Sequence, residues 1–281
     1  MILNLAYPEK SDIQFTVSKF PDGQQSITLD STFYVQLHEP IVIKSRLNSF
    51  QDLELIVCAN QAIKNIDSLL RVKLYVPYFL GARSDRKFTE GGINYLKQVI
   101  CPIINSQNFN SVTVVDPHSD VLEACLNNFD KYNNFILVDD ALSYMIGEDE
   151  EDQIVLVSPD AGAYKKVFDV AKEFKIEKII TATKVRDVKT GKILRTEIPV
   201  LDQHRNLKYV IVDDICDGGR TFIELAKAIK DSRPTAEIYL IVTHGIFSAG
   251  FDELKKYITE VYCTNSVKDI NDDFVKQLNI L

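Results

Sequence analysis

The chain has 281 residues and is 46% hydrophobic, which is enough apolar material for a large core and more typical of two domains than of one. Its formal net charge is −8 and its pI is near 5.1, so we expect no nucleic-acid partner, although a small polyanionic substrate stays compatible with a local basic patch. The five cysteines form no CxxC pair, and no apolar run approaches the roughly 20 residues of a membrane span. The start "MILNLAYPEK" does not resemble a signal peptide, so we expect a cytoplasmic protein with reduced thiols and no membrane segment.

Apolar strand-like runs alternate with amphipathic helix-like runs along the chain. The expected strands cover 53–59, 72–78, 111–118, 152–160, 176–183, 207–215 and 236–245, and the expected helices include 249–258 and the last segment "NDDFVKQLNIL". Near-continuous apolar strands that alternate with helices are typical of parallel sheets covered on both faces. The sequence therefore predicts an α/β fold with two similar doubly wound parallel-sheet domains.

A domain boundary is expected near residue 132, between "NNFDKYNN" and the strand-like "FILVDD". This division gives an N-terminal domain of residues 1–131 and a C-terminal domain of residues 132–263. We expect the segment 264–281 to return to the first domain as a helix.

Polar residues gather at the predicted carboxyl ends of the strands. They are Asp116 and His118, Asp160, Lys184, Asp213 and Asp214, and His244. Ligands of open parallel sheets bind beyond these strand ends. So many acidic and histidine residues at this edge predict a binding site rather than ordinary polar loops.

The stretch "VIVDDICDGGRT" (210–221) carries the clearest chemical signal. Adjacent carboxylates can accept hydrogen bonds from two neighbouring sugar hydroxyls. Glycines followed by a helix start let backbone N–H groups surround a phosphate, and the Thr221 hydroxyl adds a donor. The loop therefore suits a ribose that carries a phosphate on its 5-carbon, whereas a helix cap alone would need a single Asp.

This stretch resembles the phosphoribosyl-pyrophosphate loop of type I phosphoribosyltransferases and of ribose-phosphate pyrophosphokinases. Further segments resemble the pyrophosphokinases in the right order over nearly the whole chain. They are "FPDGQQSI" (20–27), "VPYFLGARSDRKF" (76–88), "VVDPHSD" (114–120), "VLVSPDAGA" (155–163) and "VTHGIFSAG" (242–250). The resemblance implies a phosphoribosyltransferase-type fold and transfer of the β,γ-diphosphoryl group of ATP to the anomeric hydroxyl of ribose 5-phosphate, with Mg²⁺ as cofactor.

The resemblance also implies roles for individual residues and a homo-oligomer, either a dimer or a hexamer. In the N-terminal domain ATP would be bound by Arg83, Ser84 and Arg86, and by Phe20, Asp22 and Gln24 from a neighbouring subunit. Metal would be bound by His118 and Asp160, and the ribose phosphate by Asp213, Asp214, Asp217, Gly218, Gly219, Arg220 and Thr221. The basic segment "TKVRDVKTGKILR" (183–195) resembles the catalytic loop of the family, in which Lys184 and Arg186 would act together with Asp217.

Several positions depart from the family pattern. Gly218 stands where a hydroxyl residue is usual, Arg220 stands where glycine is usual, and Gln24 replaces a glutamate. An ordinary β-turn is an alternative for "PDGQ", and surface exposure is an alternative for Arg220. A larger acceptor such as ADP-ribose, which would connect the protein to NAD metabolism rather than to nucleotide biosynthesis, therefore remains an alternative. A phosphoribosyltransferase and an inactive regulatory subunit are further alternatives.

Overall fold

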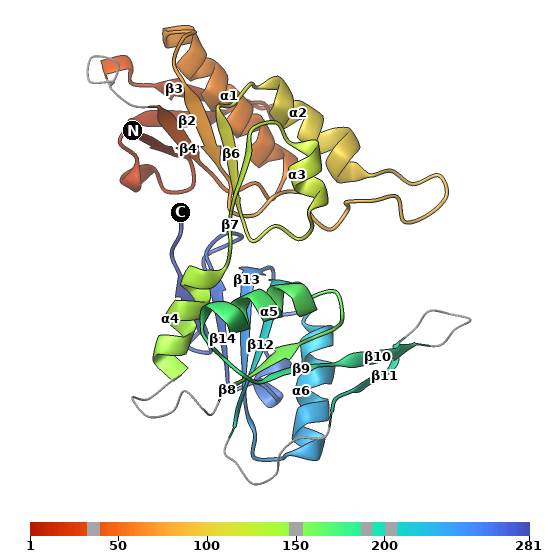
Figure 1. The fold of residues 1–281 in the computed structure, drawn as a ribbon. Coiled ribbons are helices and arrows are strands. Elements are labelled where there is room, and N and C mark those ends of the chain that lie inside the picture. Colours follow the sequence, from red (N-terminus) through yellow and green to blue (C-terminus); the bar gives the residue numbers. More distant parts are fainter. Residues whose placement is uncertain (33–39, 146–153, 187–192, 200–206) are drawn as a thin grey trace. The chain divides into compact units, whose positions relative to one another are not determined.

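The structure is a computed structural model that describes residues 1–32, 40–145, 154–186, 193–199 and 207–281, while the side chains of 184–195 lie outside the described part. The chain divides into two compact units (Figure 1). Met1–Asn133 and Ile280–Leu281 form the first unit, and Asn134–Asn279 form the second. Along the described residues no helix is both long enough and apolar enough to cross a membrane.

A five-stranded parallel sheet in the order β1-β4-β5-β6-β7 forms the centre of the first unit. The strands are β1 (Ile2–Asn4), β4 (Ile41–Lys44), β5 (Val72–Tyr75), β6 (Ser111–Val115) and β7 (Phe129–Tyr132), and an antiparallel hairpin pairs β2 (Phe15–Lys19) with β3 (Gln25–Leu29). The helices are α1 (Phe50–Ile66), α2 (Cys101–Ser106) and α3 (Val121–Cys125), with single helical turns at Pro8–Lys10 and Leu96–Ile100. Buried strand residues such as Ile43 and Leu74 form one core with Ile56 of α1 and Ile104 of α2.

The second unit contains a six-stranded parallel sheet in the order β15-β14-β13-β12-β8-β9. The strands are β8 (Ile154–Ser158), β9 (Ile179–Thr181), β12 (Lys208–Cys216), β13 (Glu237–Gly245), β14 (Glu260–Thr264) and β15 (Val275–Leu278). The helices are α4 (Phe135–Met145), α5 (Tyr164–Glu173) and α6 (Arg220–Ser232), with a 3-10 turn at Leu254–Lys256. A second hairpin pairs β10 (Thr183–Arg186) with β11 (Ile193–Glu197).

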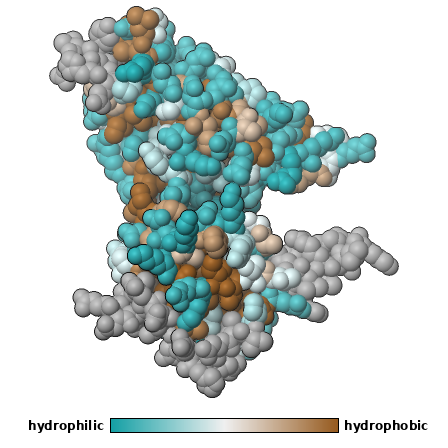
Figure 2. Space-filling view, in the orientation of Figure 1, coloured by the Kyte–Doolittle hydropathy of each residue, from teal (hydrophilic) through white to brown (hydrophobic). Residues whose placement is uncertain are grey.

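Helices cover both faces of the second sheet because its strands are apolar on both faces. Successive side chains of a strand point to opposite faces. Leu156 and Val210 belong to a core with α4 and α5, whereas Val157 and Ile211 belong to a core with α6. This arrangement confirms the predicted doubly wound α/β fold. On the visible side of the molecule, hydrophilic residues cover most of the first unit, and the second unit carries a hydrophobic patch (Figure 2).

Two segments that we expected to be strands are helical. Residues 53–59 lie within α1, and "FILVDD" begins α4. Their buried residues recur every three or four positions, as in Leu53, Ile56 and Ala59 of α1, which is the period of a helix. Ser49 and Asp52 also form a capping box at the start of α1. Helical period and capping therefore decide the structure, although Ile56 and Val57 are residues that favour strands.

The C-terminal segment is not the helix that we expected. Val275–Leu278 form β15, which pairs in parallel with β14, so this segment belongs to the second unit apart from Ile280 and Leu281. Alternation explains the strand, because Val275 is buried while Lys276 is exposed. The expected helix at 249–258 is likewise only the 3-10 turn Leu254–Lys256.

A tight turn follows β13 and depends on the absence of a side chain at Gly245. Phe247 has φ +45°, a conformation that bulky residues rarely adopt, and its ring is only 3% exposed. The ring packs over Gly245, where an added Cβ would lie 2.2 Å from Phe247 Cε2, and contacts the ring of Phe251 with centroids 5.0 Å apart. Burial of the Phe247 ring therefore stabilises a strained backbone conformation.

We predict that Gly245→Ala lowers the free energy of unfolding by roughly 1–3 kcal/mol, because the new methyl group overpacks a filled site. Gly218→Ala is the matched control, since its nearest heavy atom would be Ser248 Oγ at 3.9 Å. Urea unfolding followed by circular dichroism measures both variants. Equal unfolding midpoints for the two variants would show that the Phe247 ring can move away without cost.

Candidate active site

The segment 213–221, called the loop 213–221 below, covers the end of β12, the turn at 217–219 and the start of α6, and it lies at a switch point of the second sheet. From β8 the chain passes to β9 on one side and returns through β12 on the other side. Ligands of doubly wound sheets bind at such points, beyond the carboxyl ends of the strands. Asp160 follows β8, while Asp213 and Asp214 stand near the end of the neighbouring strand β12. The sheet topology therefore brings these predicted residues to one edge.

Asp213 and Asp214 form a partly buried carboxylate pair. Asp214 is 6% exposed, and its backbone N–H donates to Asp213 Oδ1 at 2.9 Å. Burial, reinforced by the charge of Asp214, raises the pKa of Asp213 well above its ordinary value. Lys166 of α5 opposes this shift, and its Nζ lies 3.5 Å from Asp214 Oδ1. One cation thus balances part of the negative charge, and a ligand that donates hydrogen bonds would balance more.

The rest of the loop forms a turn that ends at the start of α6. Gly219 has φ +77°, and a Cβ there would lie 3.2 Å from Leu254 Cδ2, so glycine suits both the backbone and the space. The first N–H groups of a helix lack acceptors within the helix and attract anions. Thr221 stands in the first turn of α6, while Gly218 is exposed. This geometry can accept a phosphate group.

Arg220 lies on the outside of this turn. Its Nε donates to Glu224 Oε1 at 2.7 Å, one helical turn further along α6, and its side chain is 83% exposed. The two alternatives for Arg220 were a surface position and a contact with the pyrophosphate of a longer acceptor, and this arrangement favours the surface position.

Asp217 is held by the turn that follows β13. The Ser248 hydroxyl donates to Asp217 Oδ1 at 2.6 Å, and the Ser248 backbone N–H donates to the Asp217 carbonyl at 3.1 Å. This contact joins two loops at the same sheet edge, since β12 and β13 are neighbours.

Asp160 has a local structural role in the free protein. Its Oδ1 accepts the backbone N–H groups of Gly162 and Ala163 at 3.0 and 3.2 Å, which shapes the turn before α5. Across the described residues no three His, Cys, Asp or Glu side chains converge as metal ligands. Mg²⁺ commonly takes one or two carboxylates from the protein and the remaining ligands from substrate phosphates and water. Asp160, Asp213 and Asp214 fit that use.

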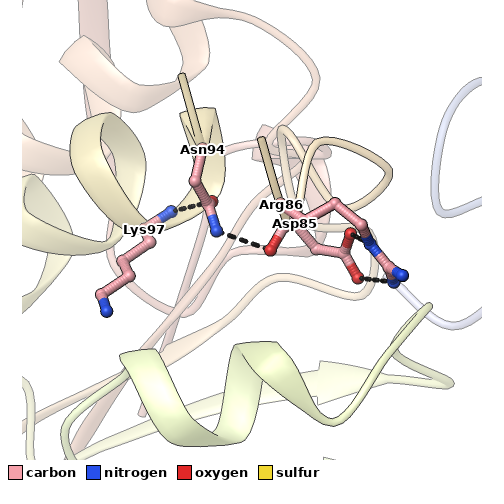
Figure 3. A network of polar contacts seen from close by, with 4 residues as sticks. All are labelled: Asp85, Arg86, Asn94 and Lys97. Atoms are coloured by element: carbon pink, nitrogen blue, oxygen red, sulfur yellow. Dashed lines mark hydrogen bonds and ion pairs between the residues drawn. The ribbon is translucent and has the colours of Figure 1, made fainter. Parts of the chain in front are cut away.

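In the first unit, the predicted ATP segment is organised around Asp85 (Figure 3). Asp85 is 3% exposed and receives two hydrogen bonds from Arg86, from Nε at 2.7 Å and from Nη2 at 2.9 Å. These bonds lower the pKa of Asp85, and the charge of His118 acts in the same direction. The Asn94 side chain donates to the Asp85 carbonyl at 2.5 Å. Arg86 and His118 therefore lie near the same buried carboxylate.

The other predicted ATP residues are less closely assembled. The Arg83 side chain is exposed, and Ser84 is held through its backbone, which donates to Gly81 and accepts from Leu96. Phe20, Asp22 and Gln24 belong to the turn between β2 and β3, where Asp22 Oδ1 accepts the Gln24 N–H at 3.1 Å. The backbone forms a β-turn in which the Gly23 N–H donates to the Phe20 carbonyl at 2.9 Å, and Phe20 is 51% exposed, so the role of this segment in ATP binding stays a prediction.

The predicted catalytic loop is described only in part. Lys184 and Arg186 belong to β10, which pairs with β11 in the antiparallel hairpin visible in Figure 1. Their side chains, and residues 187–192 between the two strands, lie outside the described part of the structure.

Three residues of these sites were missing from the sequence prediction. Lys166 balances Asp214, Asp85 orients Arg86, and Ser248 contacts Asp217. Asp85 stands inside the segment that we singled out, so its position next to Arg86 was an available signal. Lys166 and Ser248 meet their partners only through the fold.

Comparisons with known proteins agree with this organisation. The family model of the phosphoribosyl transferase domain matches residues 128–279, which is more than half of the chain. The ribose-phosphate pyrophosphokinase of Mycoplasmopsis pulmonis is 30% identical over 72% of this chain, although the alignment spans only 63% of that relative. The ribose-phosphate pyrophosphokinase of Maricaulis maris is 24% identical over 90% of this chain and 79% of the relative.

A solved structure shares the fold over nearly the whole chain. It is the phosphoribosylpyrophosphate synthetase of Mycobacterium smegmatis, with a TM-score of 0.77 over 97% of this chain and 88% of that one, at 18% identity. The chain therefore belongs to the ribose-phosphate pyrophosphokinase family and has its phosphoribosyltransferase-type fold.

Proposed function

We propose that this protein is a ribose-phosphate pyrophosphokinase that converts ATP and ribose 5-phosphate into phosphoribosyl pyrophosphate and AMP. The observation that carries the proposal is the loop 213–221, in which a partly buried carboxylate pair precedes a glycine turn and a helix start. The pair matches two adjacent sugar hydroxyls, and the helix start matches the 5-phosphate. The presence of Arg83 and Arg86 in the first unit favours a pyrophosphokinase over a phosphoribosyltransferase, which needs no ATP segment.

The reaction forms a bond between the anomeric oxygen and the β-phosphorus of ATP and breaks the bond from that phosphorus to the oxygen that leaves with AMP. The hydroxyl proton must be accepted, and we assign this role to Asp217. Transfer of this kind depends on positioning and charge neutralisation more than on covalent catalysis. Mg²⁺ would neutralise phosphate charge, and the resemblance assigns His118 of the first unit and Asp160 of the second unit to metal binding. Lys184 and Arg186 would add positive charge around the transferred group.

The direct test incubates the protein with ATP, Mg²⁺ and ribose 5-phosphate and measures AMP and phosphoribosyl pyrophosphate by chromatography. We expect the two products in equal amounts. Asp214→Asn should reduce their formation by roughly 100-fold, because it removes an acceptor for the sugar hydroxyls and leaves Lys166 without its carboxylate. AMP formed with ADP-ribose but not with ribose 5-phosphate would overturn the proposed acceptor. If the protein formed no AMP with any acceptor but converted phosphoribosyl pyrophosphate and a nucleobase into a nucleotide and pyrophosphate, it would be a phosphoribosyltransferase.

Lys184→Ala should lower turnover by roughly 100-fold or more, since a cation aimed at transition-state charge contributes on this scale. The unfolding temperature should stay unchanged. Lys172→Ala, which removes an exposed lysine of α5, is the matched control. Steady-state turnover equal to that of the control would contradict the role of Lys184.

Asp213→Asn should stabilise the free protein at neutral pH while it abolishes turnover. The folded-state pKa of Asp213 is raised, so its contribution to stability is fully present at acidic pH, below the ordinary carboxyl pKa of ~4, and is lost as the pH rises through the raised pKa. The asparagine variant lacks that loss, and its unfolding temperature should exceed that of the wild type by a few degrees at neutral pH and converge with it in acid. Thermal unfolding across this pH range measures the difference.

Asp272→Asn is a control of opposite sign. The hydrogen bond from Lys255 lowers the pKa of Asp272, so the ionised carboxylate stabilises the fold at neutral pH. This variant should be less stable than the wild type at neutral pH and should approach it in acid. A pH-independent difference for Asp213→Asn would show that the Asp213 carboxyl is not destabilised in the folded state.

A further inference from the structure

The turn after β13 is fastened to the loop 213–221 by three successive backbone hydrogen bonds. The N–H groups of Ile246 and Phe247 donate to the Cys216 carbonyl at 2.9 and 3.1 Å, and that of Ser248 donates to the Asp217 carbonyl at 3.1 Å. The strained backbone and buried ring of Phe247 stabilise this turn from the opposite side. Ser248 is thus held at a defined position beside Asp217.

The Ser248 side chain makes a short contact with the carboxylate. Its hydroxyl lies 2.6 Å from Asp217 Oδ1, within the range of charge-assisted O–H···O⁻ bonds, which are stronger than neutral ones. Ser248 is exposed, so its hydroxyl would be hydrated without cost if it pointed away. Packing therefore does not explain this orientation of the side chain, whereas the bond to Asp217 does.

We propose that Ser248 is a positioning residue that fixes the Asp217 carboxylate for its role at the sugar. This inference rests on the proposed function, because it assigns to Ser248 an effect on the proton acceptor of that reaction. A carboxylate with two free torsions samples several orientations, and one strong hydrogen bond to a rigid partner selects among them. The partner lies in the turn after the neighbouring strand β13, so the packing of the sheet and of this turn sets the direction of the carboxylate.

The contribution of the hydroxyl can be separated from that of the turn. The three backbone hydrogen bonds and the Phe247 ring do not involve the Ser248 hydroxyl. Ser248→Ala should therefore leave the turn and the unfolding temperature unchanged, and Ser248→Thr should keep the donor because the exposed site has room for a methyl group.

The experiment measures kcat and the KM for ribose 5-phosphate in AMP formation, with saturating Mg²⁺ and ATP. We expect Ser248→Ala to lower kcat by roughly 10-fold, the loss of one hydrogen bond to a charged group, with little change in the KM for ribose 5-phosphate. Ser248→Thr should recover most of the lost rate. Ser143→Ala is the matched control, because the Ser143 hydroxyl donates to a carbonyl within α4.

A double-mutant cycle tests whether Ser248 acts through Asp217. In an Asp217→Asn background, Ser248→Ala should add little to the loss of kcat, since the group that it positions has already been changed. An additive effect, an equal loss in Ser248→Thr, or a Ser248→Ala enzyme with wild-type kcat would each overturn the inference. An active wild type combined with any of these results would leave the proposed function intact, whereas a wild type that forms no AMP would fail the proposed function itself.

Discussion

Negative charge concentrated at one edge of a parallel sheet is the constraint on which the second unit depends. Asp213 and Asp214 are adjacent and partly buried, and Lys166 is the cation paired with Asp214 at 3.5 Å. Burial and repulsion raise the pKa of Asp213, so the free protein holds a pair that its own packing does not favour. Such local destabilisation is typical of binding sites, where a ligand replaces the lost solvation. In the proposed function a sugar that donates two hydrogen bonds would supply that compensation, so stability and function would compete at this pair.

The doubly wound sheet holds the strands on either side of the carboxylate pair firmly in place. Strands β12 and β13 are buried on both faces, so their carboxyl ends are held by the two cores rather than by the loops. The turn at Gly245 and Phe247 extends this rigidity to the loop 213–221 through backbone hydrogen bonds. The packing of the sheet and of this turn thus sets the positions of the side chains at the site, so a polar segment can present Asp217 in one direction.

The sequence was most informative where one local pattern decides the structure. Continuous apolar runs such as 207–215 predict buried parallel strands. The stretch 210–221 also contains, within one short segment, the carboxylates, glycines and threonine on which the predicted sugar-phosphate site depends. The strand prediction for residues 53–59 was wrong because an apolar run of this length is compatible with both a strand and a helix. The capping box of Ser49 and Asp52 favours the helix. The contacts of Lys166 and Ser248 could not be predicted, because each joins segments that are distant in sequence and meet only in the folded sheet.

The first unit meets its proposed substrate with an arginine that is already paired. Both nitrogens of Arg86 that face Asp85 are engaged, yet 65% of the guanidinium side chain is exposed (Figure 3). A bidentate carboxylate fixes the plane of the guanidinium and leaves its remaining N–H groups directed outward. The pair is nearly neutral as a unit, so its long-range attraction for a polyanion is weak. In the proposed function Arg86 would therefore contribute orientation more than net charge, and the neutralisation of triphosphate charge would have to come mainly from Mg²⁺.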